Sequence, residues 1–249
     1  MNIRLDEGFL FGLGAFETMA VYGGRPIFLE KHLERLARGL EFLGISRRVT
    51  EEDVYRFLEE NGIPFPEVLK IVVSEENTLF LPRKNPYQKE AYEKGFTIDL
   101  AQIRRNETSR FVYHKTLNYG ECIRERREAA ARGFDEAVFL NSRGEICEGT
   151  TSNLFFVRDG RIVTPALSGG LLPGVMRGYL LERYDIEETK LHREDLERFD
   201  ECFLTNSLMG VMPVIQFGNH LFPSRETADR IGEAYRREYG LFHQIPSEE

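Results

Sequence analysis

Apolar residues recur at steps of three and four in the first third of the chain, and this spacing predicts an amphipathic helix with one buried face. We expect the helix to begin near Glu30 and to end before Gly44, because glycine commonly follows the last turn of a helix. The repeating residues are Leu29, Leu33, Leu36, Leu40 and Leu43. Thr50 and Asp53 have the spacing of a capping box and predict the start of a second helix.

The second helix is expected to stop at Asn61-Gly62. Runs of β-branched, aromatic and other apolar residues predict strands before and after the two helices, at residues 16–22, 26–29, 68–74, 79–81, 96–103, 137–141, 154–157, 162–164 and 202–205. Asp159-Gly160 predicts a hairpin turn. Later helices are expected over residues 117–132, after Pro173-Gly174, and from about residue 225 to 239.

The polar segment RRNETS, residues 104–109, has no hydrophobic period and is interpreted as a loop between two lobes. The sequence therefore predicts an α+β fold with a small N-terminal lobe, residues 1–105, and a larger C-terminal lobe, residues 106–249.

Composition and charge narrow the class of protein. The chain has 249 residues, of which 41% are hydrophobic and 30% charged, as in ordinary folded proteins. Its net charge of −8 repels nucleic-acid backbones and anionic lipid surfaces, and no apolar run reaches the ~20 residues of a membrane span. Asp6 and Glu7 interrupt the N-terminus before a signal-peptide core could form, so we expect a cytoplasmic protein that binds neither nucleic acid nor membrane.

Several common site motifs do not fit. The three cysteines lack CxxC spacing, which argues against a disulfide framework and a zinc site and favours buried thiols. The five histidines are scattered without ligand spacing, so no metal site is expected. GLGAFE from Gly12 lacks the third glycine of a dinucleotide fingerprint, GGLLPG from Gly169 lacks the Lys-Ser/Thr of a phosphate loop, and no GxSxG elbow occurs.

Lys115 stands in YHKTLNYG, among Tyr113, Leu117 and Tyr119. Desolvation by such neighbours disfavours the ammonium form and makes a neutral amine available for Schiff-base chemistry. An ordinary surface lysine is the alternative interpretation of the same residue.

Two further segments have the composition of binding loops. EGTTSNLFF, from Glu148, is either a polar turn before a strand or part of a site. GGLLPGVMR, residues 169–177, places a glycine turn and Pro173 directly before a helix whose free N–H groups could hold an anion, although an ordinary proline-initiated helix has the same sequence.

These segments, taken together, resemble the fold-type IV pyridoxal-phosphate enzymes, the branched-chain and D-amino-acid aminotransferase-like superfamily. The resemblance spans almost the whole chain in order: HxxRL from His32, HKTLN from His114, ExxxSN from Glu148, LLPGVMR from Leu171 and FLTNSLMGVMPV from Phe203. It implies a small α/β lobe, a larger β-barrel-like lobe with helices, pyridoxal 5'-phosphate between them, and a homodimer whose partner completes the pocket.

The resemblance also implies a role for each matching residue. Lys115 falls on the Schiff-base lysine that also moves the substrate proton, and Glu148 on the acidic partner of the pyridine nitrogen. Arg35 falls on the phosphate-binding arginine, which can bind an anion through two N–H groups, and Tyr119 on a partner of the ring hydroxyl. The phosphate would also be held by the backbone amides of Val175 and Met176 and by Ser207.

Within this superfamily the sequence resembles aminodeoxychorismate lyase, in RRNETSRFVYHKTLNY and FLTNSLMGVMPV. That activity converts 4-amino-4-deoxychorismate to 4-aminobenzoate and pyruvate, in folate biosynthesis. An aminotransferase that uses branched-chain or D-amino acids with a 2-oxo acid is the alternative, because Leu13 and Ala20 replace an Asp and an Arg of many members. A non-catalytic binding protein is a third. Glu17 or Thr18 is expected to face the site, and strand parity leaves open which one does.

Overall fold

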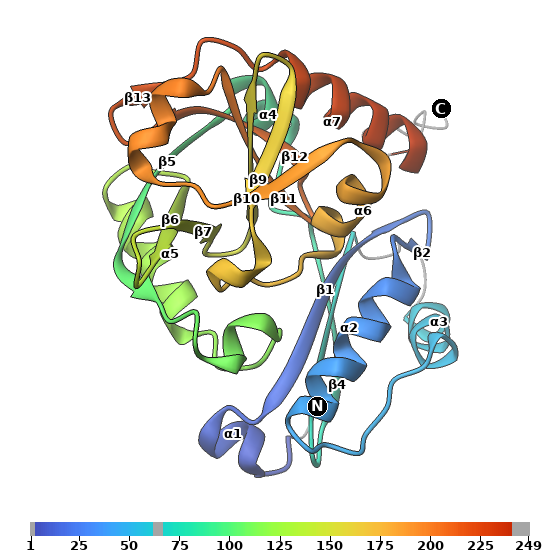
Figure 1. Ribbon diagram of the computed structural model, residues 1–249. Helices are drawn as coiled ribbons and strands as arrows, with labels where there is room; N and C mark the ends of the chain where they lie inside the picture. The colour runs from blue at the N-terminus through green and yellow to red at the C-terminus, as the bar shows by residue number, and fades with distance from the viewer. Residues whose placement is uncertain (1–2, 62–66, 241–249) are drawn as a thin grey trace, which may run out of the picture.

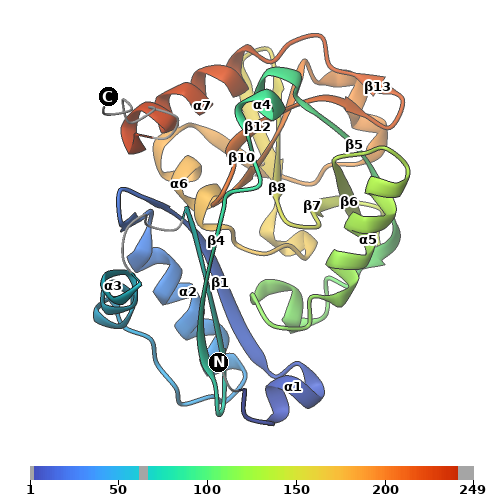
Figure 2. The same cartoon turned by 180° about the vertical axis from the view of Figure 1, so that it is seen from behind.

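Two separate β-sheets organise the chain in the computed structural model, which describes residues 3–61 and 67–240 (Figures 1 and 2). The smaller sheet has the strand order β2-β1-β3-β4. The larger sheet runs β10-β9-β8-β11-β12-β5-β6-β7, with β13 beside β12. Because β7 also pairs with β8, the strands β8, β11, β12, β5, β6 and β7 form a closed ring. The predicted two-lobed α+β fold with a barrel-like larger lobe is confirmed.

The smaller lobe combines its sheet with α2 and α3. Its elements are α1 (Glu7–Phe11), β1 (Gly14–Tyr22), β2 (Arg25–Pro26), α2 (Leu29–Phe42), α3 (Glu51–Glu60), β3 (Val68–Ser74) and β4 (Thr78–Arg83). Leu36 and Leu40 of α2 pack on Met19 of β1 in one core, as the spacing predicted. The capping box of Thr50 and Asp53 is present, and α3 ends at the C-cap Asn61, while Gly62 lies outside the described residues.

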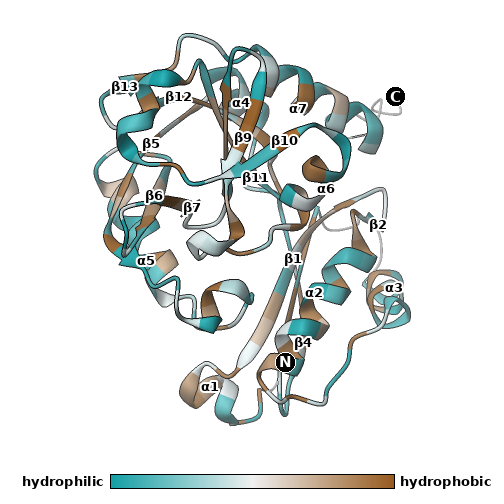
Figure 3. Ribbon diagram, in the orientation of Figure 1, coloured by the Kyte–Doolittle hydropathy of each residue, from teal (hydrophilic) through white to brown (hydrophobic). Residues whose placement is uncertain are grey.

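The larger lobe surrounds its ring of strands with helices. Its elements are α4 (Lys89–Lys94), β5 (Phe96–Arg105), α5 (Gly120–Ala131), β6 (Glu136–Asn141), β7 (Ile146–Gly149), β8 (Asn153–Arg158), β9 (Arg161–Pro165), α6 (Val175–Arg183), β10 (Ile186–Thr189), β11 (Glu201–Asn206), β12 (Gly210–Phe217), β13 (His220–Leu221), α7 (Glu226–Tyr239) and 3-10 turns at Arg110–Tyr113, Leu167–Gly169 and Arg193–Arg198. Fully buried Phe139, Phe155 and Phe203 lie on barrel strands, and Figure 3 shows β7 as strongly hydrophobic while α7 alternates between hydrophilic and hydrophobic segments.

Two expected elements differ in the structure, and several others were not expected. The strand expected over residues 26–29 is only Arg25–Pro26, because Phe28 adopts a left-handed conformation and α2 begins at Leu29. The helix expected from Leu117 begins at Gly120, because the chain at Thr116 is extended and pairs with Ala15 of β1, with a hydrogen bond from the N–H of Leu117 to the carbonyl of Gly14. Sequence analysis did not anticipate α1, α4, β7, β10, β12 or β13.

β5 was expected to close the smaller lobe, but it hydrogen-bonds in parallel with β6 and β12 of the larger sheet. The change from one sheet to the other therefore falls between β4 and β5. The polar segment after β5 suggested a boundary after this strand. The sequence could not show its pairing with β12, because β12 lies more than a hundred residues further along the chain. The division of the chain into two domains at residue 105 stays a prediction.

Within the described residues, every helix is too short or too polar to cross a bilayer, and groups of three or more metal-ligating side chains are absent.

Candidate active site

A cavity of about 790 Å³ is lined by residues of both lobes. Its wall includes β1 and α2 from the smaller lobe, and β5, α5, the turn after β7 and the start of α6 from the larger lobe. All the residues that sequence analysis singled out for cofactor binding line this one cavity: Arg35, Lys115, Tyr119, Glu148, Val175, Met176 and Ser207. Their individual roles remain predictions.

Lys115 lies where the two lobes meet. Its carbonyl accepts a hydrogen bond from the N–H of Phe16 on β1 (2.9 Å), so the backbone of this residue is tied to the smaller lobe. Its Nζ lies 4.5 Å from the ring centre of Phe16 and 5.0 Å from that of Tyr119. Burial, together with the charge of Arg35, lowers the pKa of the Lys115 amine to about 8. A neutral, nucleophilic amine is therefore accessible near neutral pH.

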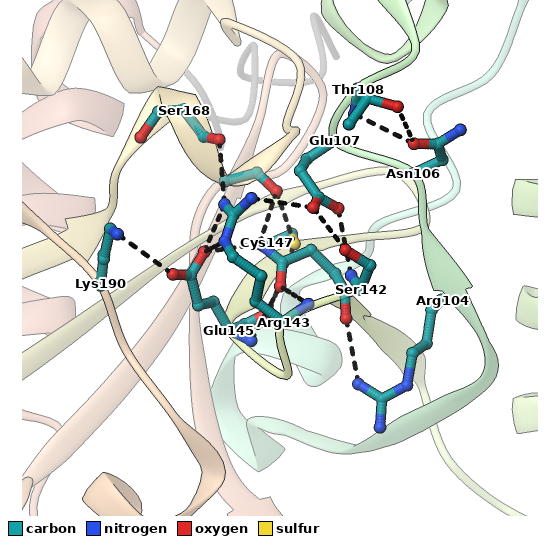
Figure 4. Close-up of polar contacts among 12 residues, drawn as sticks. Arg104, Asn106, Glu107, Thr108, Ser142, Arg143, Glu145, Cys147, Ser168 and Lys190 are labelled. Atoms are coloured by element: carbon teal, nitrogen blue, oxygen red, sulfur yellow. Dashed lines mark hydrogen bonds and ion pairs between the residues drawn. The ribbon is translucent and has the colours of Figure 1, made fainter.

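The segment that precedes Lys115 is anchored in the larger lobe by the polar network in Figure 4. The carboxylate of Glu107 accepts hydrogen bonds from Ser142 N (3.1 Å) and Arg143 Nη1 (2.8 Å), and Arg143 also pairs with Glu145 (2.7 Å). The hydroxyl of Tyr113 donates back to the carbonyl of Glu107 (2.9 Å). Hydrogen bonds to both lobes thus hold the backbone around Lys115 in place, and this determines where its amine can lie.

Glu148, on β7 of the barrel, lines the cavity. Its side chain is only 5% exposed, and Arg105 Nη2 lies 2.6 Å from its Oε1. The backbone N–H of Leu172 donates to Oε2 (2.9 Å). Burial lowers the pKa of Arg105, but the Glu148 carboxylate outweighs burial, and the pKa of this guanidinium is raised. Sequence analysis missed Arg105, because it stands in the segment interpreted as a loop.

Arg35 is held by a buried carboxylate. Its Nε and Nη2 donate to the two oxygens of Glu17 at 2.7 Å each, and Nη1 donates to the carbonyl of Pro173 (3.2 Å). Of the five N–H groups of a guanidinium, two remain for a ligand in the cavity. Burial raises the pKa of Glu17, but Arg35 and His32 outweigh it and hold the pKa of this carboxyl well below its ordinary range.

The structure settles which residue of β1 faces the cavity. Thr18 lines it, whereas Glu17 points to the opposite face, toward α2. Side chains alternate across a strand, so only one of two neighbours can face the site.

Donor groups from separate elements converge near the start of α6. The helix begins at Val175 after the N-cap Gly174, and its first N–H groups have no intrahelical acceptor. Ser207 lines the same cavity, and so does Thr205, whose buried hydroxyl has no hydrogen-bond partner among the described residues. An unpaired buried hydroxyl is costly, and an anion in the cavity would satisfy it. Sequence analysis missed Thr205, although it stands two positions before Ser207 in LTNS.

Tyr119 is oriented by the turn after β7. Its hydroxyl donates to the carbonyl of Thr150 (2.8 Å), and its ring packs edge-on against Phe16. The turn itself is organised by buried Glu136, whose carboxylate accepts from Thr150 N (3.1 Å) and Ser152 Oγ (3.0 Å). Burial raises the pKa of the Tyr119 phenol far above its ordinary value, so it stays a neutral hydrogen-bonding group.

The charge of the cavity is opposite to that of the chain. Seven Lys and Arg residues line the cavity but only two Glu residues, in a chain whose net charge is −8. Lys70 of β3 lies 4.5 Å from the ring centre of Phe16, and neither its side chain nor that of Arg83 forms a hydrogen bond or ion pair within the described part of the chain. Burial and Arg83 lower the pKa of Lys70. Two cations without counterions in one cavity favour an anionic ligand.

Comparisons with known proteins agree with this geometry. The model of the family described as amino-transferase class IV matches residues 14–217. An aminodeoxychorismate lyase of Bacillus subtilis is 29% identical, over 94% of this chain and 88% of its own. A probable branched-chain-amino-acid aminotransferase of Rickettsia felis is 27% identical, over 89% of this chain and 85% of its own. The crystal structure of the branched-chain amino acid aminotransferase from Thermobaculum terrenum, in its PLP-bound holo form, has a TM-score of 0.79 at 21% identity, over 96% of this chain and 90% of that one.

Proposed function

Because the chain belongs to the amino-transferase class IV family, we propose that the cavity binds pyridoxal 5'-phosphate and that Lys115 is its covalent partner. The residues present fit the three parts of that group. A phosphate meets the free N–H groups of Arg35, the start of α6 and the unpaired hydroxyl of Thr205. The ring nitrogen would be bound by the carboxylate of Glu148, and the aldehyde would react with the amine of Lys115, whose pKa is about 8.

Each residue then has a defined task. The bound cofactor supplies an aldehyde that joins amines and a ring that withdraws electrons from the bond to be broken. Arg35, the amides of Val175 and Met176, and the hydroxyl of Ser207 hold its phosphate, and Glu148 keeps the proton on its ring nitrogen. Tyr119 orients the ring hydroxyl. Lys115, once displaced by the substrate amine, takes the proton from the substrate carbon.

We propose that the reaction is the aminodeoxychorismate lyase reaction, in which 4-amino-4-deoxychorismate gives 4-aminobenzoate and pyruvate for folate biosynthesis. Lys115 would take the proton from C4 of the substrate while the C3–O bond to the enolpyruvyl group breaks. The released enolate would take up a proton at its methylene carbon to become pyruvate, and the ring would become aromatic without a second substrate. The observation that carries this choice is the likeness to the aminodeoxychorismate lyase of Bacillus subtilis over 94% of this chain. Lys70 and Arg83, which have no counterion in the described part of the chain, suit the two carboxylates of this substrate. These cations stand on β3 and β4, whereas Ala20 of β1 replaces the arginine of many family members.

The alternative is an aminotransferase acting on branched-chain or D-amino acids with a 2-oxo acid. The Rickettsia felis relative favours it, and so does the apolar part of the cavity wall, with Phe16, Phe111 and Val112. A 2-oxo dicarboxylic acid would also meet Lys70 and Arg83. The two activities share Lys115 and differ in whether an amino acceptor is needed.

We further propose a cytoplasmic homodimer. Phe9, Leu10 and Phe11 of α1 are 73%, 55% and 65% exposed. They lie close to the cavity, because Asn118 of its wall donates a hydrogen bond to the carbonyl of Gly12 (3.0 Å). Exposed apolar side chains clustered in this way are typical of a surface that another protein covers.

The deciding experiment measures pyruvate from 4-amino-4-deoxychorismate with pyridoxal 5'-phosphate and no 2-oxo acid. We expect pyruvate and 4-aminobenzoate in equal amounts, and none from Lys115→Ala. Activity that requires 2-oxoglutarate would replace the lyase by the aminotransferase. Borohydride should fix the cofactor to the peptide that contains Lys115, and failure to take up cofactor would favour a non-catalytic binding protein.

A further inference from the structure

Arg105, the last residue of β5, lies against the carboxylate that we assign to the ring nitrogen of the cofactor. Its Nη2 and Nε lie 2.6 and 3.2 Å from the same atom, Oε1 of Glu148. The two side chains are 12% and 5% exposed, so little water competes for this ion pair. Because both N–H groups converge on one oxygen, the other carboxylate oxygen stays outside the pair.

That second oxygen is also fixed. Oε2 of Glu148 accepts the backbone N–H of Leu172 at 2.9 Å, which prevents the carboxylate from rotating about its Cγ–Cδ bond. A carboxylate oxygen accepts two hydrogen bonds, so Oε2 keeps one free position. Glu148 lines the cavity, and this free position is available to a ligand there.

The guanidinium of Arg105 is itself held in place. Its central carbon lies 4.4 Å from the ring centre of Phe139, a residue with no exposed surface. Nη2 also contacts Sγ of Cys122 at 3.4 Å. Arg105 therefore acts as a rigid support for Glu148.

We propose that Arg105 is a positioning residue that gives Glu148 its counter-charge and holds Oε2 free to accept the N–H of the cofactor's ring nitrogen. The inference rests on the proposed function. A buried carboxylate without a nearby cation favours its protonated form, and a protonated Glu148 could no longer balance the charge of a protonated ring nitrogen. The contribution of Arg105 to cofactor affinity should therefore depend on the presence of the ring nitrogen. If Arg105 only linked β5 to β7, its contribution would be the same with or without that nitrogen.

The test compares two probes on apo-protein: pyridoxal 5'-phosphate, and its 1-deaza analogue, in which C–H replaces the ring nitrogen. Dissociation constants are measured by fluorescence titration for the wild type and for Arg105→Met. We expect the variant to bind pyridoxal 5'-phosphate about tenfold more weakly or worse, and the analogue within about twofold of wild type. An equal loss for both probes, or no loss for either, would overturn the inference.

Two further variants control the experiment. Arg132→Met removes an arginine with the same two kinds of partner on the surface, an ion pair to Asp99 (2.5 Å) and the ring of Phe134 (5.4 Å), and it should change neither constant. Arg105→Lys keeps the charge and should recover part of the affinity for pyridoxal 5'-phosphate alone. If Arg105→Met fails to fold, as judged by circular dichroism, Arg105→Lys takes its place with the same two probes. A wild type that binds neither probe would refute the proposed function itself.

Discussion

Lys115 illustrates how a residue's chemistry depends on its neighbours. The sequence placed aromatic and apolar residues beside it, and the structure adds Phe16 and the charge of Arg35 from the other lobe. Both effects disfavour the ammonium form, and the resulting pKa of about 8 lies well below the ~10.4 of an ordinary lysine. Glu148 and Arg35 line the same cavity, and each forms an ion pair with a residue that the motifs did not include.

The lowered pKa predicts the pH dependence of cofactor capture. Only the neutral amine attacks an aldehyde, so the capture rate of pyridoxal 5'-phosphate by apo-protein should rise between pH 6 and 8 and level off above about pH 8 to 9. Stopped-flow absorbance follows this rate, with Lys115→Ala as the control that forms no covalent adduct. A rate that keeps rising tenfold per pH unit up to pH 10 would show that the amine is not perturbed.

Among the elements, α6 connects local sequence to the site most directly. Its helix was predicted from Pro173-Gly174, and the structure places its first turn on the cavity wall. Gly174 has an ordinary backbone conformation, so its role is one of space: a Cβ there would lie 2.0 Å from Oδ1 of Asn153. Asn153 in turn donates to the carbonyl of Leu172 (3.0 Å) and holds the loop before the helix.

Two glycine substitutions, one at the N-cap of α6 and one within the helix, should affect cofactor binding and protein stability differently. Gly174→Ala forces Asn153 to move and should weaken the binding of pyridoxal 5'-phosphate about tenfold or more. Gly178→Ala adds a methyl group where no atom lies within 4 Å, and should stabilise the protein by up to about 1 kcal/mol with unchanged affinity. Thermal melts and fluorescence titration measure the two quantities. Equal affinities for both variants would argue against the phosphate site at α6.

At the scale of the whole molecule, the site exists only because the two lobes meet. The smaller lobe contributes Phe16, Arg35 and Lys70, and the larger lobe contributes Glu148, the start of α6 and Ser207. Between them lies the Lys115 segment, tied to β1 by its backbone and to the barrel by Glu107. The apolar residues of α1 lie at the edge of this junction.

The proposed homodimer can be tested through α1. Phe9→Asp places a charge on a side chain that is 73% exposed, and should shift the sedimentation coefficient from dimer to monomer. Leu221→Asp changes a residue of similar exposure, 67%, on β13, and should leave the dimer intact. A monomeric wild type, or a Phe9→Asp variant that stays dimeric, would contradict this interface.

The sequence by itself determined the features that depend on neighbouring residues. Hydrophobic spacing and caps located α2 and α3, and Asp159-Gly160 marked the hairpin of β8 and β9. The five motifs identified the family, which the match over residues 14–217 confirms. The seven residues that these motifs assigned to cofactor binding all line one cavity, and their individual roles stay predictions.

The tertiary structure alone decided what depends on distant residues. β5 joins β6 and β12, Glu17 turns away from the cavity to hold Arg35, and Arg105 reaches Glu148, forty-three positions along the chain. Thr205 and Lys70 acquire importance only because their polar side-chain atoms have no hydrogen-bond or ion-pair partner in the part of the chain that the structure describes. Periodicity records which face of an element is buried, but strand partners, ion pairs and pKa values depend on which remote groups share a space from which water is excluded.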